Sequence, residues 1–164
     1  ACAERIACYI TTHRDSYDIV VTTQDWHIDP GDHFSGNPDF VDSWPPHGVA
    51  GTDEAEIHPA IAEIPVDAHV KKGQYAAAYS GFEGTIKGGS SLETILRDHR
   101  IEAVDVVGLA LSHCVKDTAL DAQHLGFTTT CLTDLSEPVS LESGEAAVAA
   151  MEDAGVTVTT SSQL

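Results

Sequence analysis

The sequence predicts one α/β domain, covering residues 1–164, in which helices pack on the faces of a parallel sheet. Three observations lead to this fold class. A chain of 164 residues is long enough to bury a core and has the length of a single domain. Its second half alternates β-branched runs with amphipathic stretches, an order that is typical of parallel sheets. Neither an internal repeat nor a linker divides the chain.

The elements are placed by hydrophobic spacing, β-branched runs and turn residues. Ile6, Tyr9 and Ile10 have helical spacing, and Ser90 with Glu93 offers a capping box for a later helix. In the first half we expect a helix at 1–10, a strand buried on both faces at 19–23, and a weaker strand at 66–71. In the second half we expect strands at 103–110, 127–132 and 156–160, and helices that end at Gly126 and Gly155.

Composition limits the partners and the compartment. Acidic side chains outnumber basic ones by 26 to 8, which gives a formal net charge of −18. This excess argues against nucleic acid or an anionic membrane as a partner, because both are bound through Lys and Arg patches. The four cysteines are scattered without a CxxC pair, which favours a reduced, cytoplasmic protein. The sequence leaves open whether the protein is a monomer or a homo-oligomer.

Residues 25–65 hold six of the seven prolines and little periodicity, so we expect this irregular segment to be functional. Asp25, His27, His33 and His47 lie in it within 23 positions. Imidazole and carboxylate groups together suit zinc, iron or manganese, and a metal can rigidify a loop without regular structure. We interpret the segment as a metal site, although a polar loop with surface histidines would have the same composition.

Cys114 lies where the strongest predicted strand passes into a helix, and Lys72 follows the C-terminal end of another predicted strand. A helix N-terminus lowers the pKa of a thiol and can hold an oxyanion, and a nearby lysine can stabilise the thiolate. A small buried cysteine and a solvated lysine are the alternatives. Because parallel strands end at one edge of a sheet, we expect the metal loop, Lys72 and Cys114 to converge there.

Several motifs together resemble one known family. They are Asp25-Trp-His27-Ile-Asp-Pro-Gly-Asp-His33, Trp44-Pro-Pro-His47-Gly, Lys72-Gly-Gln-Tyr, Ala78-Tyr79-Ser-Gly-Phe-Glu-Gly and Val107-Gly-Leu-Ala-Leu-Ser-His113-Cys114-Val. In this combination they resemble the nicotinamidase/pyrazinamidase branch of the isochorismatase-like cysteine hydrolases. The resemblance implies a three-layer α/β/α, Rossmann-like fold. It also implies hydrolysis of nicotinamide, and of pyrazinamide, to the acid and ammonia, as a step of NAD salvage.

The resemblance further implies a role for each motif residue. Cys114 would be the nucleophile that forms a thioester, with Lys72 as its basic partner. Backbone N–H groups of Ala110 and Cys114 would form an oxyanion hole, next to a cis peptide between Leu109 and Ala110. One divalent metal ion (Zn, Fe or Mn) would be bound by Asp25, His27, His33 and His47. Trp44, Tyr79, Leu109 and His113 would line the substrate pocket.

The sequence departs from the family pattern at one point. The triad of the family also uses an aspartate on a first strand, in an apolar run followed by Asp-x-Gln-x-Asp-Phe, and this segment is absent here. Asp15 and Asp18 are poor substitutes, because they precede the predicted strand at 19–23 whereas the site follows it. We therefore expect that an N-terminal strand, with the triad aspartate, is missing from this chain.

Two other functions stay open. One is a related cysteine amidohydrolase that acts on another small amide, although many such relatives lack the histidines found here. The other is a catalytically inactive relative that binds a metal or a ligand, which the absent aspartate would explain. Release of ammonia from nicotinamide distinguishes the two from the leading interpretation.

Overall fold

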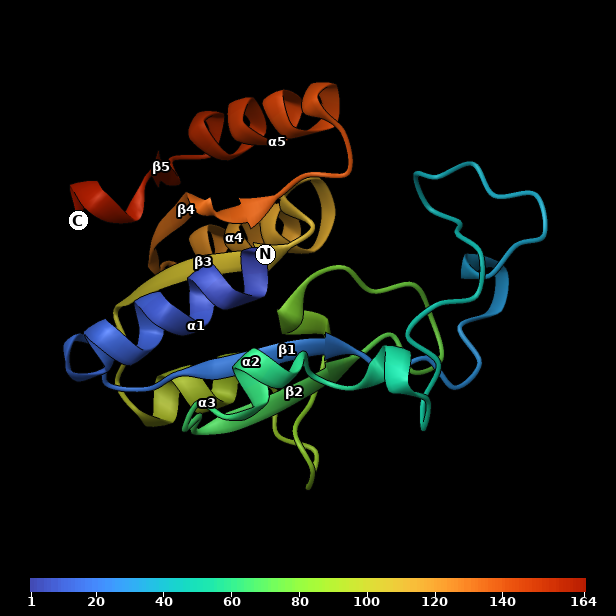
Figure 1. Ribbon diagram of the computed structural model, residues 1–164, viewed down its shortest axis with the longest axis horizontal. Coiled ribbons are helices and arrows are strands. Elements are labelled where there is room, and N and C mark those ends of the chain that lie inside the picture. The colour runs from blue at the N-terminus through green and yellow to red at the C-terminus, as the bar shows by residue number, and fades with distance from the viewer.

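A computed structural model describes all 164 residues and confirms the predicted parallel α/β fold. β1 (Val21–Asp25) pairs with β2 (Ala68–Lys72) in one sheet. In the second sheet, β4 (Thr128–Glu137) lies between β3 (Ala103–Leu109) and β5 (Thr157–Thr159). All pairings between the strands are parallel, but the strands form two sheets where we expected one, because β1 and β3 are not hydrogen-bonded to each other (Figure 1).

Helices cover both faces of β4, which gives the three layers. The five helices of the chain are α1 (Cys2–His13), α2 (Pro59–Ala62), α3 (Leu92–Asp98), α4 (Lys116–His124) and α5 (Leu141–Asp153). Leu132 of β4 packs against α1, in a cluster with Cys2 and Ile6. The preceding residue, Cys131, packs instead in a cluster with Met151 of α5 and residues of α4. Neighbouring strand residues point to opposite faces, so β4 is buried from both sides.

Some predicted elements differ in detail from the observed ones. β1 begins at Val21 instead of residue 19 and is half-buried, because only β2 pairs with it. The helix α3 is capped by Ser91, whose Oγ accepts a hydrogen bond from the Thr94 amide at 3.2 Å, and not by Ser90. Gly126 and Gly155 follow α4 and α5 with φ of 93° and 94°, which confirms both as helix stops.

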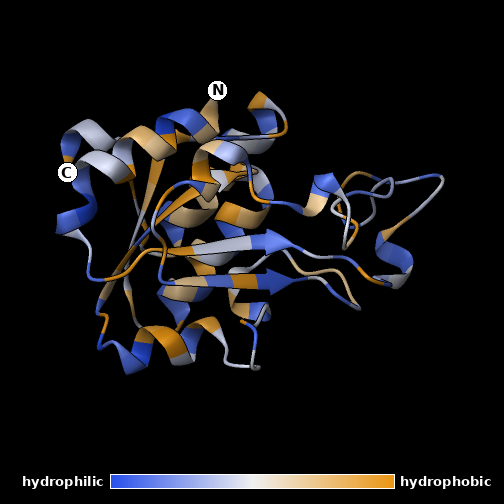
Figure 2. Ribbon diagram, turned by 60° about the horizontal axis from the view of Figure 1, so that its bottom comes forward, coloured by the Kyte–Doolittle hydropathy of each residue, from blue (hydrophilic) through white to orange (hydrophobic).

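The irregular segment leaves the C-terminal end of β1 and projects from the body of the molecule (Figure 1). It contains only short turns of 3-10 helix before α2. Figure 2 shows the tips of β1 and β2 in the hydrophilic colour, because Gln24-Asp25 and Lys71-Lys72 end these strands. None of the helices combines the length and the apolar character needed to cross a bilayer. The polar ends of β1 and β2 mark the edge of the sheet at which the irregular segment begins as the place for a candidate site.

The core contact between α1 and β4 predicts a loss of stability on truncation. Leu132 is fully buried, and we expect Leu132→Ala to lower the free energy of unfolding by about 2–5 kcal/mol, because the removed methyl groups leave a cavity. Leu141 is 77% exposed, so Leu141→Ala should change it by less than about 0.5 kcal/mol. Urea unfolding measures both variants, and equal losses would contradict the packing of α1 on β4.

Candidate active site and metal centre

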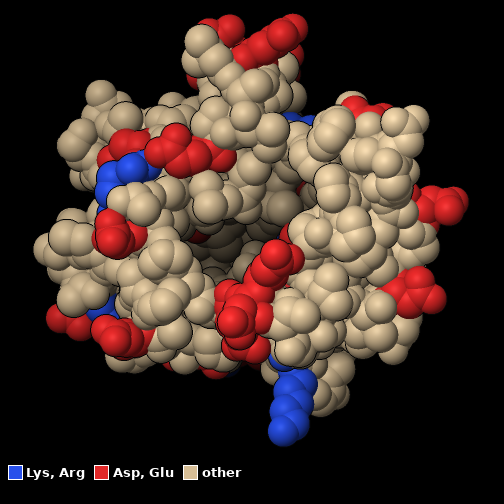
Figure 3. Space-filling model, turned by 45° about the vertical axis from the view of Figure 1, so that its right-hand side comes forward, with Lys and Arg blue, Asp and Glu red and all other residues tan.

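The expected convergence of strand ends is observed. Asp25 and Lys72 are direct partners in the parallel register of β1 and β2. Cys114 lies in a π-helical turn, Leu111–Val115, that connects β3 to α4. Figure 3 views the molecule from the side on which β1 ends, and shows a hollow at the centre with Asp and Glu side chains around it. The structure thus brings together the metal loop, Lys72 and Cys114.

The Lys72 side chain is buried, with 3% of its surface exposed, and every ammonium proton has an acceptor. Nζ donates to Asp25 Oδ1 at 2.5 Å, to the Ala78 carbonyl at 3.1 Å and to Cys114 Sγ at 3.4 Å. An ammonium group has three donors, so this set uses all of them. Burial by itself lowers the pKa of Lys72, but Cys114 and the Asp25 carboxylate outweigh it and raise this pKa. Lys72 is therefore a fixed positive charge beside the thiol.

The Cys114 thiol responds to two opposing effects. Burial raises its pKa above the ordinary value, whereas the Lys72 ammonium and the Ala110 amide lower it and only partly compensate. The backbone of Cys114 is also held in place, because Thr118 Oγ1 donates to its carbonyl at 2.6 Å and accepts the Gly81 amide at 2.9 Å. Thr118 was not among the residues selected from the sequence, although its i+4 spacing from Cys114 on a helix is a readable signal.

The peptide bond between Leu109 and Ala110 is cis, as the family resemblance implies. It immediately precedes the π-helical turn, in which the Val115 amide donates to the Ala110 carbonyl at 3.1 Å. The turn inserts an extra residue into the start of the helix, a feature often found at functional sites. It places Ala110 next to Cys114, as an oxyanion hole built from their amides would require.

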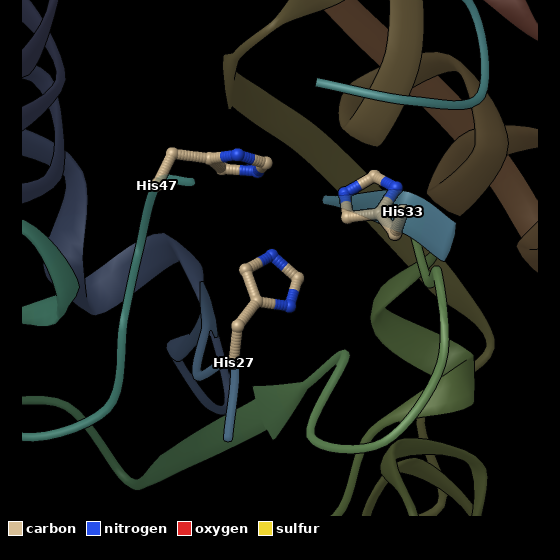
Figure 4. A group of neighbouring side chains, drawn as sticks. All are labelled: His27, His33 and His47. Atoms are coloured by element: carbon tan, nitrogen blue, oxygen red, sulfur yellow. The ribbon is translucent and has the colours of Figure 1, made fainter. Parts of the chain in front are cut away.

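The three histidines of the irregular segment point toward one another (Figure 4). Each ring is anchored through Nδ1 to a backbone carbonyl: His27 to Gly73 at 2.6 Å, His33 to Asp42 at 2.8 Å and His47 to Pro45 at 2.8 Å. A ring that donates from Nδ1 keeps the Nε2 lone pair available for a metal. One ligating nitrogen of each ring lies within 4.8 Å of the others.

His27 supplies the observation that tests the fit to a metal. Its Nε2 is buried and has no hydrogen-bond partner, which is costly unless a ligand completes the group. Burial lowers the pKa of His27 and keeps the ring neutral, in the form that ligates metals. A side chain at Gly73 could not be accommodated, because its Cβ would lie 2.5 Å from the His27 ring. The residues present therefore fit a divalent metal.

Asp25 lies beside the three histidines but outside their tightest grouping. Its Oδ2 is 3.9 Å from Nε2 of His27 and 3.9 Å from Nε2 of His47. Its other oxygen, Oδ1, accepts the hydrogen bond from Lys72. One carboxylate thus contacts both the histidine cluster and the Cys114–Lys72 pair. The sequence assigned Asp25 to the metal alone, because a register that places it opposite Lys72 cannot be read from spacing.

Aromatic rings border the histidine cluster and the thiol. The rings of Trp44 and Tyr79 each lie 5.3 Å from the His113 ring, between centroids, and Trp44 Nε1 donates to Tyr79 Oη at 2.9 Å. The Tyr79 ring is 5.8 Å from His33. Leu109, also expected in the pocket, is 62% exposed. The three rings form one aromatic cluster that reaches His33 through Tyr79 and directly precedes Cys114 in the chain through His113.

Residues 1–163 match the family model of the isochorismatase domain. This chain belongs to the isochorismatase family. It is 46% identical over 162 residues to the nicotinamidase/pyrazinamidase of Mycobacterium tuberculosis (strain ATCC 25618 / H37Rv), which covers 99% of this chain and 87% of the relative.

Two solved structures are similar to this chain over nearly its whole length. A nicotinamidase/pyrazinamidase of Acinetobacter baumanii has a TM-score of 0.83 and 33% identity, over 99% of this chain and 87% of that one. The pyrazinamidase of Pyrococcus horikoshii in complex with zinc has a TM-score of 0.81 and 31% identity, over 97% of this chain and 84% of that one. These likenesses confirm the fold expected from the motifs.

The histidine cluster predicts the effect of losing one ring. We expect His47→Ala to weaken metal binding at least about tenfold, because a direct ligand should matter at least as much as an outer-shell partner. His124→Ala, at the exposed end of α4, is the matched control and should leave binding unchanged. Metal analysis after stripping and reloading measures both, and unchanged occupancy in His47→Ala would remove this residue from the ligand set.

The raised pKa of Cys114 predicts the pH dependence of its alkylation. Only the thiolate reacts, so in metal-free protein the rate with iodoacetamide should still rise at alkaline pH beyond the ordinary thiol pKa. Lys72→Gln removes the charge that lowers this pKa, and should slow the reaction at a given pH by about tenfold. Peptide mass spectrometry measures the rates. A wild-type rate that levels off near neutral pH would contradict the effect of burial.

Proposed function

We propose that this protein is a metal-dependent nicotinamidase that hydrolyses nicotinamide to nicotinate and ammonia, with pyrazinamide as a second substrate. The observation that carries the proposal is the buried contact of Cys114 Sγ with Lys72 Nζ at 3.4 Å, next to both the aromatic rings and the histidine cluster. The activities for which the similar proteins are named support it. As the resemblance implies, nicotinate would then enter NAD salvage in the cytoplasm.

Substrate recognition divides between the aromatic rings and the metal ligands. Trp44, Tyr79 and His113 offer a surface against which a flat heteroaromatic ring can pack, since aromatic rings prefer stacked or edge-to-face contacts. A divalent metal ion held by Asp25, His27, His33 and His47 would supply a Lewis acid that binds and orients the ring nitrogen. Together these groups would direct the carboxamide of the substrate toward Cys114.

The acylation step is carried by the Cys114–Lys72 pair. The thiolate of Cys114 adds to the carboxamide carbon, and the electron pair of the carbonyl moves to its oxygen. Backbone N–H groups of Ala110 and Cys114 donate to this oxyanion. When the tetrahedral intermediate collapses, the carbon–nitrogen bond breaks, and the nitrogen takes up the proton lost by the thiol and leaves as ammonia. The product is a thioester on Cys114.

The second half of the reaction releases the acid. Water adds to the thioester carbon, the same amides hold the oxyanion, and the carbon–sulfur bond breaks. The acid leaves as the carboxylate. Of the two protons of this water, one restores the Cys114 thiol and the other passes to the solvent. Throughout, the ammonium of Lys72 stabilises the thiolate both before attack and after its release, because it is held 3.4 Å from Sγ by two other acceptors.

Ammonia release from nicotinamide by the metal-loaded protein tests the proposal. We expect turnover by the wild type and by Cys8→Ala, whose thiol is exposed on α1, and a loss of at least about 1000-fold in Cys114→Ala, because no other group can form the thioester. Benzamide, which lacks the ring nitrogen, should be a much poorer substrate. Turnover retained by Cys114→Ala would refute the nucleophile, and no turnover by a folded, metal-loaded wild type would refute the reaction.

A further inference from the structure

We propose that Asp25 is shared between Lys72 and the metal, so that the buried ammonium of Lys72 limits how tightly the histidine cluster binds its cation. The two carboxylate oxygens of Asp25 point to different partners. Oδ1 is 2.5 Å from Lys72 Nζ, and Oδ2 is 3.9 Å from Nε2 of both His27 and His47. The inference rests on the proposed metal site but does not depend on the reaction.

The electrostatics of this arrangement sets the direction of the effect. A carboxylate that accepts a short, charged hydrogen bond on one oxygen has less negative charge to offer a cation at the other. The ammonium also repels a nearby dication directly, and solvent screens this repulsion little on the side of Lys72, which is buried. Lys72 therefore opposes metal binding, although it is not a ligand.

The charges around Asp25 differ between the two sides of the histidine cluster. A cavity of about 390 Å³ borders Asp25 and His47, and its lining includes Glu54 and Glu56. These carboxylates attract a cation, so the approach to the cluster is negative while its inner side carries the positive charge of Lys72. The same charge stabilises the Cys114 thiolate, so retaining a lysine here favours the nucleophile at the expense of metal affinity.

The chain supplies a matched control one residue away. Lys71 precedes Lys72 on β2, and neighbouring strand residues point to opposite faces. Its ammonium lies 3.3 Å from the centroid of the Trp26 ring and is not paired with Asp25. Lys71→Gln therefore removes the same charge from the same strand without touching the Asp25 carboxylate. Any difference in Zn²⁺ affinity between Lys72→Gln and Lys71→Gln therefore comes from the contact of Lys72 with Asp25 and not from the change in net charge.

The experiment measures the Kd for Zn²⁺ of stripped protein by competition with a chromogenic chelator. We expect Lys72→Gln to bind Zn²⁺ at least about tenfold more tightly than wild type, and Lys71→Gln to stay within about twofold. Glutamine retains a donor for Asp25 or Ala78, which helps the buried position to fold. Lys72→Arg, which keeps the charge, is the second variant and should not tighten binding. Equal Kd values for Lys72→Gln and Lys71→Gln would overturn the proposal, as would tighter binding by Lys72→Arg.

A double-mutant cycle tests whether Asp25 transmits the effect. If Lys72 acts through the shared carboxylate, the gain from Lys72→Gln should shrink by at least about threefold in an Asp25→Asn background. The same gain in both backgrounds would overturn the sharing of Asp25. The outcomes also separate this inference from the proposed function. A wild type that binds no Zn²⁺ refutes the metal site itself. A wild type that binds Zn²⁺ with a Kd that Lys72→Gln does not change refutes only the coupling between Lys72 and the metal.

Discussion

The buried ammonium of Lys72 is the constraint around which the site is organised. A charged group out of contact with water must have each of its protons paired, and here the three acceptors come from three separate parts of the chain. Asp25 ends β1, Ala78 lies in the loop after β2, and Cys114 lies in the turn after β3. Satisfying one ammonium therefore fixes the distances among the C-terminal end of β1, the loop after β2 and the Cys114 thiol.

A second constraint holds the metal loop, which has almost no regular secondary structure. The three histidine rings are oriented by the backbone carbonyls of Gly73, Asp42 and Pro45. In a helix or sheet such carbonyls would accept from backbone amides, but here they accept hydrogen bonds from the rings. The anchor at Gly73 directly follows Lys72. The orientation of His27 and the position of the buried ammonium thus depend on the same turn after β2.

Much of this could be predicted from the sequence, for identifiable reasons. The run at 103–110, with Cys114 after it, predicted β3 and the helix beyond it, because β-branched residues and a glycine stop are local signals. The contact between Asp25 and Lys72 joins residues 47 positions apart and depends on the register of two parallel strands, which no local signal specifies. Alternation on β2 did contain a clue, since Val70 and Lys72 share a buried face. The prediction that β1 is buried on both faces was wrong: the strand is half-buried, and a β-branched run does not reveal how many neighbours a strand has.

The position of Lys72 argues that the pair serves function more than stability. Replacing a buried ion pair with apolar residues of similar volume is often neutral or stabilising, so a lysine at a position that alternation assigns to the core needs another reason. That reason is chemical. Burial alone would hold Cys114 as a neutral thiol, and the ammonium is the nearby charge that opposes this effect. The carboxylate that pairs with the lysine in turn lies beside the histidine cluster, so the proposed nucleophile and the proposed metal site are linked through one side chain, Asp25.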